Sequence, residues 1–151
     1  MSKLDVETLA ESETERLCQL FENKNVFIVI DETELNKVKY VNVVIGDLAV
    51  PEKTYLLDCS EVETANQQVI AAKIDDALRK INIPRAKFVL LLSDAASYMM
   101  AVTAALKILY LNLFYVTCVA HMLHNCAEKM RKYMLTTPMW INLLLGLRLP
   151  Q

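Results

Sequence analysis

Two short apolar runs, each leading into an aspartate, constrain the fold of this chain more than any other feature of its sequence. The first covers residues 27–30 and leads into Asp31; the second covers residues 88–92 and leads through Ser93 into Asp94. Runs of four or five apolar residues of this kind are typical of buried strands. Open α/β sheets place their chemistry at the carboxyl ends of such strands. The sequence therefore predicts two buried strands, each ending in a carboxylate.

The composition indicates a single globular domain. The chain has 151 residues, of which 54% are hydrophobic, and it contains only two glycines and four prolines, so it can bury a sizeable core. The net charge of −2 predicts no nucleic-acid partner by itself, but the charges are unevenly distributed. Residues 1–78 hold 16 acidic and 7 basic side chains, whereas residues 79–151 hold 2 and 9. The basic half either faces a polyanion such as DNA or forms a solvated face.

The cysteines and the N-terminal sequence indicate an intracellular protein. Cys18, Cys59, Cys118 and Cys126 form no CxxC pair, and residues 1–24 are polar and acidic, unlike a signal peptide. We therefore expect reduced cysteines and a location inside the cell.

One apolar segment raises the question of a membrane span. Residues 95–123 are nearly all apolar, but Lys107 lies near their middle. A lysine at the centre of a spanning helix costs about 2.5–3.5 kcal/mol. The segment also divides naturally into a helix and a strand near Asn112, so we expect no membrane partner.

The hydrophobic periodicity predicts three strands followed by alternating helices and strands. Strands are expected over residues 26–30, 40–45, 54–59, 87–92 and 113–119, and helices over residues 4–22, 64–81, 95–110 and 123–133. The polar residues 34–39 are expected to form a turn, Thr64 to cap the second helix, and Ser93 or Asp94 to cap the third. The order βββαβαβα is the ribonuclease H-like arrangement: an α/β fold with a mixed five-stranded sheet and flanking helices. This order divides the chain into an N-terminal helical lead-in (1–25), a partial ribonuclease H-like domain (26–135) and an apolar C-terminal tail (136–151).

This topology brings the two aspartates together. The fourth strand pairs with the first, so Asp31 and Asp94 meet at the ends of neighbouring strands. Two carboxylates can share divalent metal ions of the kind that assist phosphoryl transfer. Working sites usually have a third acid. Glu32, Glu34 and Asp58 are unconvincing for that role, because Glu32 alternates to the other face, Glu34 lies in a turn and Asp58 ends a more distant strand. Alternatively, the two aspartates only cap strand ends or helices.

A second cluster contains possible metal ligands of another type. Cys118, His121, His124 and Cys126 are chemically suited to zinc, although the spacing CxxHxxHxC is not that of a common structural zinc site. Packing and hydrogen bonding are the alternative roles. The hydroxyl groups of Thr33, Ser93 and Ser97 have no partnered base in a recognisable order, so a hydrolase triad is not expected.

Four stretches, in this order, resemble the catalytic core of hAT-superfamily transposases, in particular their domesticated or DUF659-like relatives. They are Asp31-Glu32-Thr33, Val41-Asn42-Val43-Val44-Ile45-Gly46, Leu91-Leu92-Ser93-Asp94-Ala95-Ala96-Ser97-Tyr98-Met99 and Val116-Thr117-Cys118-Val119-Ala120-His121-Met122-Leu123-His124. The resemblance implies a ribonuclease H-like domain that cuts and joins DNA with Mg²⁺ or Mn²⁺. Asp31 and Asp94 match the first and second catalytic acids and metal ligands, and Cys118 and His121 match the CxxH motif.

The chain also departs from the hAT pattern. The third catalytic glutamate lies far downstream in the family and has no counterpart here, and no BED-type zinc finger precedes Asp31. The resemblance therefore implies a truncated or domesticated core that is catalytically incomplete alone. DNA is an expected partner, as is a protein or a second copy bound through the apolar tail, and no small-molecule substrate is expected. The resemblance also implies a nuclear location. A non-catalytic interaction module of the same fold and an unrelated α/β protein with structural aspartates are the alternatives.

Overall fold

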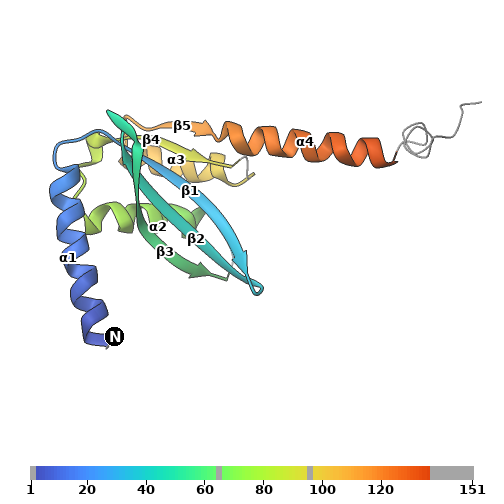
Figure 1. Cartoon of the computed structure of the whole chain (residues 1–151). Coiled ribbons are helices and arrows are strands. Elements are labelled where there is room, and N and C mark those ends of the chain that lie inside the picture. Colours follow the sequence, from blue (N-terminus) through green and yellow to red (C-terminus); the bar gives the residue numbers. More distant parts are fainter. Residues whose placement is uncertain (1–2, 64–65, 95–96, 137–151) are drawn as a thin grey trace, which may run out of the picture. The chain divides into compact units, whose positions relative to one another are not determined.

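The computed structural model describes residues 3–63, 66–94 and 97–136 (Figure 1). The chain divides into two compact units, Met1–Thr117 and Cys118–Gln151. The first unit contains α1 (Lys3–Phe21), β1 (Val26–Leu35), β2 (Val38–Asp47), β3 (Val50–Val62), α2 (Gln67–Lys80), the short 3-10 helix η1 (Arg85–Lys87), β4 (Phe88–Ser93), α3 (Met99–Leu109) and β5 (Phe114–Thr117). The second contains α4 (Val119–Thr136).

The five strands form one mixed sheet in the order β3-β2-β1-β4-β5. The pairs β1–β2 and β2–β3 are antiparallel, whereas β1–β4 and β4–β5 are parallel. Short hairpins join the antiparallel strands, and the helical crossovers α2 and α3 lead to the parallel ones, as chain geometry requires. This is the predicted arrangement, so the α/β, ribonuclease H-like fold class is confirmed.

The core of the first unit lies between one face of the sheet and its helices. Ile28, Val43 and Leu91 are fully buried on this face, and they belong to one cluster with residues of α1, α2 and α3. In α2 and α3 the buried residues recur at helical spacing: Ile70, Ile74, Ala77 and Leu78, then Met99, Val102, Thr103 and Leu106. Burying one large aliphatic side chain contributes about 1.5–3 kcal/mol. The alternating residues of the strands therefore attach both crossover helices to the sheet.

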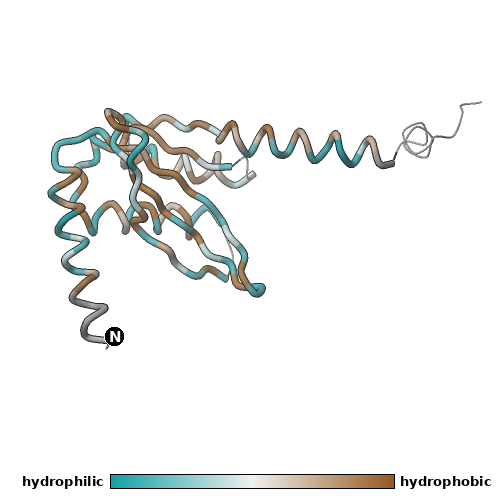
Figure 2. The backbone as a smooth tube through the Cα atoms, viewed as in Figure 1, coloured by the Kyte–Doolittle hydropathy of each residue, from teal (hydrophilic) through white to brown (hydrophobic). Residues whose placement is uncertain are grey.

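The opposite face of the sheet, called here the outer face, is also apolar. Alternation and register place the following residues on it: Leu56, Val44, Phe27, Val29, Leu90, Leu92, Phe114 and Val116. Within this row Leu56, Phe114 and Val116 are exposed. Brown segments along β1, β4 and β5 mark the apolar character of these strands in Figure 2. The sheet is thus apolar on both faces, and only one face belongs to the buried core.

The hairpin between β1 and β2 is longer than predicted. Residues 34–39 were expected to form a turn, but β1 continues to Leu35 and β2 begins at Val38. Asn36 and Lys37 both have positive φ angles, of 52° and 66°, as a two-residue type I′ turn requires. Asparagine tolerates this conformation, so a tight hairpin forms here without glycine.

Several predicted boundaries are corrected by the structure. The N-cap of α2 is Asn66, whereas the expected cap Thr64 lies outside the described residues. The third helix begins at Met99 rather than directly after Asp94, and β5 ends at Thr117 because α4 already starts at Val119. Of the predicted C-terminal tail (136–151), residue 136 belongs to α4, and residues 137–151 lie outside the described residues. In the described part of the chain, no helix has the length and apolar character needed to cross a bilayer.

Candidate functional site

Asp31 lies in the part of β1 that extends beyond β4. The two strands pair in parallel up to Val29 and Leu92, while β1 continues to Leu35. Asp31 is half-buried and lies opposite Asn42 of β2. The Thr33 hydroxyl donates to the Asp31 Oδ2 atom at 3.4 Å, and Asn42 Nδ2 donates to Thr33 Oγ1 at 3.3 Å. These contacts connect the Asp31 carboxylate to Thr33 on β1 and, through Thr33, to Asn42 on β2.

Asp94 comes directly after β4, on the strand that neighbours β1. The last paired residues of the two strands are Val29 and Leu92, and Asp31 and Asp94 each follow by two positions. The parallel register therefore brings both aspartates to the same end of adjacent strands, as the sequence predicted. Their roles as catalytic acids and metal ligands remain a prediction.

Glu32 belongs to the same group of acids, although sequence reasoning set it aside. Its partner on β2 is the fully buried Val41, so it does alternate to the other face from Asp31. Burial, the negative charge of Asp94 and then that of Asp31 nevertheless raise the pKa of Glu32 above its ordinary value, while Lys39 lowers it. The three acids therefore concentrate negative charge at this end of the sheet. Alternation places Glu32 and Asp31 on opposite faces of the sheet, but the charges of acids at a strand end still influence one another.

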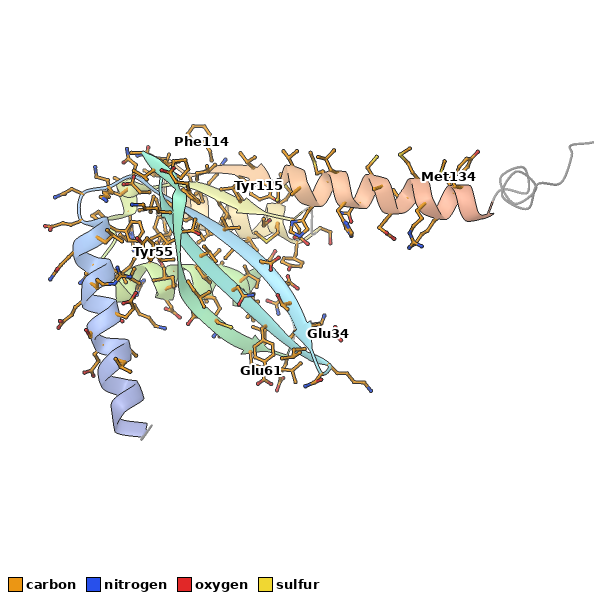
Figure 3. All side chains as sticks on the ribbon, viewed as in Figure 1. Glu34, Tyr55, Glu61, Phe114, Tyr115 and Met134 are labelled. Atoms are coloured by element: carbon orange, nitrogen blue, oxygen red, sulfur yellow. The ribbon has the colours of Figure 1, made fainter. Side chains whose placement is uncertain are left out.

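The other acids considered for a third position lie elsewhere. Glu34 is exposed and lies near the tip of the β1–β2 hairpin (Figure 3). Asp58 accepts a hydrogen bond from Lys80 Nζ of α2 at 3.4 Å. Asp58 is therefore paired with α2 on the core side of the sheet.

The carboxylate groups at this site are of the type that binds Mg²⁺ or Mn²⁺, but they are too few to hold such an ion by themselves. Carboxylate oxygens are the ligands that these hard cations prefer. Among the described residues, however, no three His, Cys, Asp or Glu side chains are arranged to hold a metal ion. Asp31 and Asp94 can therefore supply at most part of a coordination shell, with water or a substrate phosphate completing it.

The CxxH pair lies at the start of α4, in the second unit. Hydrogen bonds from the backbone N–H and the side chain of His121 lower the pKa of the Cys118 thiol, and the backbone of Ala120 contributes as well. The start of a helix favours a thiolate for the same reason, since its N–H groups point toward the cap. His124 and Cys126 are exposed, and within the described residues these four side chains do not form a three-ligand metal group.

Tyr115 of β5 was not considered in the sequence reasoning, yet it contacts the main chain at Asp94. Its hydroxyl donates to the Asp94 carbonyl oxygen at 3.1 Å and lies 3.1 Å from Ser93 Oγ. Ser93 Oγ also donates to the Asp94 carbonyl, at 2.8 Å. Ser93 was expected as a helix cap, but α3 begins further along the chain, with Tyr98 as its N-cap. No sequence signal identifies such a contact, because the two strands are separated by α3.

No protein-family model matches the chain, and no curated protein matches it in sequence. The chain is similar to the catalytic core domain of BIV integrase at 15% identity and a TM-score of 0.45, over 72% of this chain and 65% of that one. It is similar to the magnesium-bound, dimeric HTLV-2 integrase catalytic core domain at 14% identity and a TM-score of 0.42, over 77% and 74% of the two chains.

A Bacteroides thetaiotaomicron protein with an actin-like ATPase fold and unknown function is also similar, at 12% identity and a TM-score of 0.42, over 70% of this chain and 39% of that one. The chain thus spans less than two thirds of the first and last of these three structures. All three similarities concern the path of the chain, and none assigns a role to a residue.

Proposed function

We propose that this chain is a transposase-derived, ribonuclease H-like domain, corresponding to the N-terminal part of a hAT-type core that cuts and joins DNA. The observation that carries the proposal is the register between β1 and β4, with Asp31 and Asp94 each two positions beyond the last parallel pair. The resemblance to hAT transposases gives these two positions the roles of first and second catalytic acid. The excess of basic residues after position 78 supports DNA as the partner. The nuclear location follows only from the resemblance to hAT transposases.

The isolated chain is proposed to be catalytically incomplete. Two carboxylates hold Mg²⁺ or Mn²⁺ weakly, and the described residues provide no third ligand. When bound, such a cation would polarise a phosphate oxygen and stabilise negative charge on it. The contribution of this chain is to hold the Asp31 carboxylate through Thr33 and Asn42 and to fix Asp94 at the end of β4.

A titration of the full chain with Mn²⁺, followed by NMR, tests the site. Weak binding should broaden resonances around residues 31 and 94 first, and Asp31→Asn or Asp94→Asn should each reduce this broadening. The matched control is Asp58→Asn, which removes an acid paired with Lys80 away from the site. Broadening spread evenly over the acidic surface would refute the site and would favour an unrelated α/β protein with structural aspartates.

A nicking assay tests the incomplete state. With Mn²⁺ and supercoiled DNA, the wild-type chain should show no strand cleavage above the level of Asp94→Asn. Metal-dependent nicking by the wild type that disappears in Asp94→Asn would show that the chain is an active nuclease.

A non-catalytic interaction module of the same fold is the second candidate function, and two surfaces favour it. The outer face exposes Phe114, which projects from β5 in Figure 3, and also Val116 and Leu56. In the second unit, α4 has an apolar stripe at helical spacing, which we define as Val119, Met122, Leu123, Cys126, Met130, Tyr133 and Met134; all of these side chains are exposed. Exposed stripes of this kind are suited to binding protein.

Light scattering after size exclusion tests the interaction module. Self-association that is lost in Leu123→Glu but retained in Lys132→Glu, on the polar side of α4, would support it. A chain that is monomeric and well behaved whether or not residues 137–151 are deleted would argue against it.

A further inference from the structure

Two hydroxyl groups meet at the main-chain carbonyl of Asp94. Ser93 Oγ lies 2.8 Å from this carbonyl oxygen, and the Tyr115 hydroxyl lies 3.1 Å from it. The two hydroxyl oxygens are themselves 3.1 Å apart. The three contacts form a closed triangle at the exact place where β4 ends, beside the acid that the proposed function assigns to catalysis.

The strand pairing explains why this carbonyl needs such partners. The last pair between β4 and β5 is Ser93 with Thr117, so the Asp94 carbonyl lies beyond the regular ladder. A buried or half-buried carbonyl without a partner costs about 1–3 kcal/mol. The tyrosine on β5 and the serine on β4 supply hydrogen bonds where the sheet no longer does.

The positions of the two side chains make the arrangement rigid. Ser93 is 1% exposed, and the ring of Tyr115 is half-buried against the hydrophobic core. Tyr115 pairs with Leu91, two residues before Ser93, so both hydroxyl-bearing side chains belong to the core face of the sheet. Each hydroxyl has one proton, and the carbonyl oxygen can accept both of them. Both protons can therefore be directed at the Asp94 carbonyl.

We propose that Tyr115 and Ser93 are positioning residues for Asp94, whose main-chain carbonyl they hold so that its carboxylate stays at the end of β4 beside Asp31. The proposal rests on the proposed function in assigning metal binding to Asp94. Tyr115 touches neither metal nor DNA in this scheme; it acts through the backbone of the acid. β5 contributes no acid to the site, but through Tyr115 it helps to position Asp94.

The test compares two single variants, their double variant and one control, all in the full chain. Tyr115→Phe and Ser93→Ala each remove one hydroxyl from the Asp94 carbonyl. Tyr110→Phe is the matched control: its hydroxyl donates to Asp75 Oδ1 at 2.6 Å, on α2. It removes the same chemical group from a hydrogen bond away from Asp31 and Asp94.

The first measurement is made without metal. Two quantities are followed: the carbonyl ¹³C shift of Asp94 and the ¹⁵N relaxation of residues 93 and 94. Both should change in Tyr115→Phe, and they should change more in the Tyr115→Phe/Ser93→Ala double variant. Both should remain unchanged in Tyr110→Phe. The second measurement is the Mn²⁺ titration, in which the dissociation constant should rise several-fold in Tyr115→Phe but not in Tyr110→Phe. A general loss of stability would change these measurements in both Tyr115→Phe and Tyr110→Phe. A positioning role of Tyr115 changes them in Tyr115→Phe alone.

The two measurements separate the failure of this inference from failure of the proposed function. If the wild-type chain binds no Mn²⁺ at residues 31 and 94, the proposed metal site is wrong, and the metal-free measurements then decide whether Tyr115 and Ser93 hold Asp94. Unchanged carbonyl shift and relaxation in a folded double variant would overturn the positioning role. An altered Asp94 backbone with an unchanged Mn²⁺ affinity would overturn the link to metal binding.

Discussion

The ring of Phe27 lies across Gly46, the residue directly opposite it on β2. A β-carbon on residue 46 would overlap the Phe27 ring, which occupies the space that any other residue would fill. Phe27 is thereby 7% exposed although it belongs to the outer face. Gly46, within β2, therefore serves packing: because it has no side chain, the aromatic ring of Phe27 on the neighbouring strand can lie over its backbone.

Gly46→Ala should destabilise the fold, because the ring of Phe27 must move out of its position. Overpacking of this kind costs about 1–3 kcal/mol. Urea unfolding measures the effect, and the double variant Phe27→Leu/Gly46→Ala should recover part of the loss, since a leucine can move aside. An alanine variant as stable as the wild type would show that the ring does not need this space.

Asn66→Ala should destabilise the first unit through the start of α2. The Asn66 side-chain oxygen accepts hydrogen bonds from the backbone N–H groups of Gln68 and Val69, at 3.0 and 3.1 Å. Loss of such a cap costs about 0.5–2 kcal/mol. The midpoint of urea unfolding should fall in Asn66→Ala and stay near that of the wild type in Asn66→Asp, which retains an acceptor. Gln67→Ala, at an exposed neighbouring position, is the control.

Asp94→Asn should lower the pKa of Glu32. Burial raises the pKa of this carboxyl first, and the charge of Asp94 is the next cause, so removing that charge makes ionisation of Glu32 easier. A ¹³C titration of the Glu32 carboxyl in both proteins measures the change. Asp58→Asn should leave the Glu32 titration unaltered. An unchanged Glu32 pKa in Asp94→Asn would mean that the two acids are farther apart than the structure places them.

The same raised pKa predicts the sign of a pH effect on stability. The folded state holds the Glu32 proton to a higher pH than the unfolded state does, so ionisation of Glu32 disfavours folding. The contribution of Glu32 to the free energy of unfolding therefore falls as the pH rises from the ordinary glutamate pKa through the higher pKa of Glu32 in the folded state. Glu32→Gln should remove this part of the pH dependence and raise the unfolding free energy at neutral pH relative to the wild type. A loss of stability at neutral pH in Glu32→Gln would contradict this sign.

Tyr110 should make the fold sensitive to high pH. Burial and then its hydrogen bond to Asp75 raise the pKa of the Tyr110 hydroxyl well above its ordinary value. The unfolded chain therefore loses this proton at a lower pH than the folded one, and the unfolding free energy falls as the pH rises above about 10. Urea titrations at increasing pH should show a shallower decline in Tyr110→Phe. If the unfolding free energy declined equally steeply with pH in both proteins, Tyr110 would ionise as readily in the folded state as in the unfolded state.

The local pattern of the sequence determined most of the fold. Alternation in residues 40–45 and helical spacing at Ile70, Ile74 and Leu78 are properties of neighbouring residues, so the strands, helices and their order could be predicted. The short connections also determined the antiparallel meander. Asp31 and Asp94 could be placed at one end of the sheet, because parallel strands carry their carboxyl ends to the same side.

Tertiary structure decided the features that depend on contacts between distant segments. Ser93 looked like a helix cap, but only the position of Tyr115, 22 residues later, shows that its hydroxyl contacts the Asp94 carbonyl and Tyr115 instead. Alternation placed Glu32 on the other face from Asp31, but the charge of Asp94 still raises the pKa of Glu32, because alternation defines a face and not a distance between charges. The space that Gly46 leaves for Phe27 likewise depends on the register of two strands. Sequence periodicity reports which side of an element is buried, whereas register and packing determine which side chains meet.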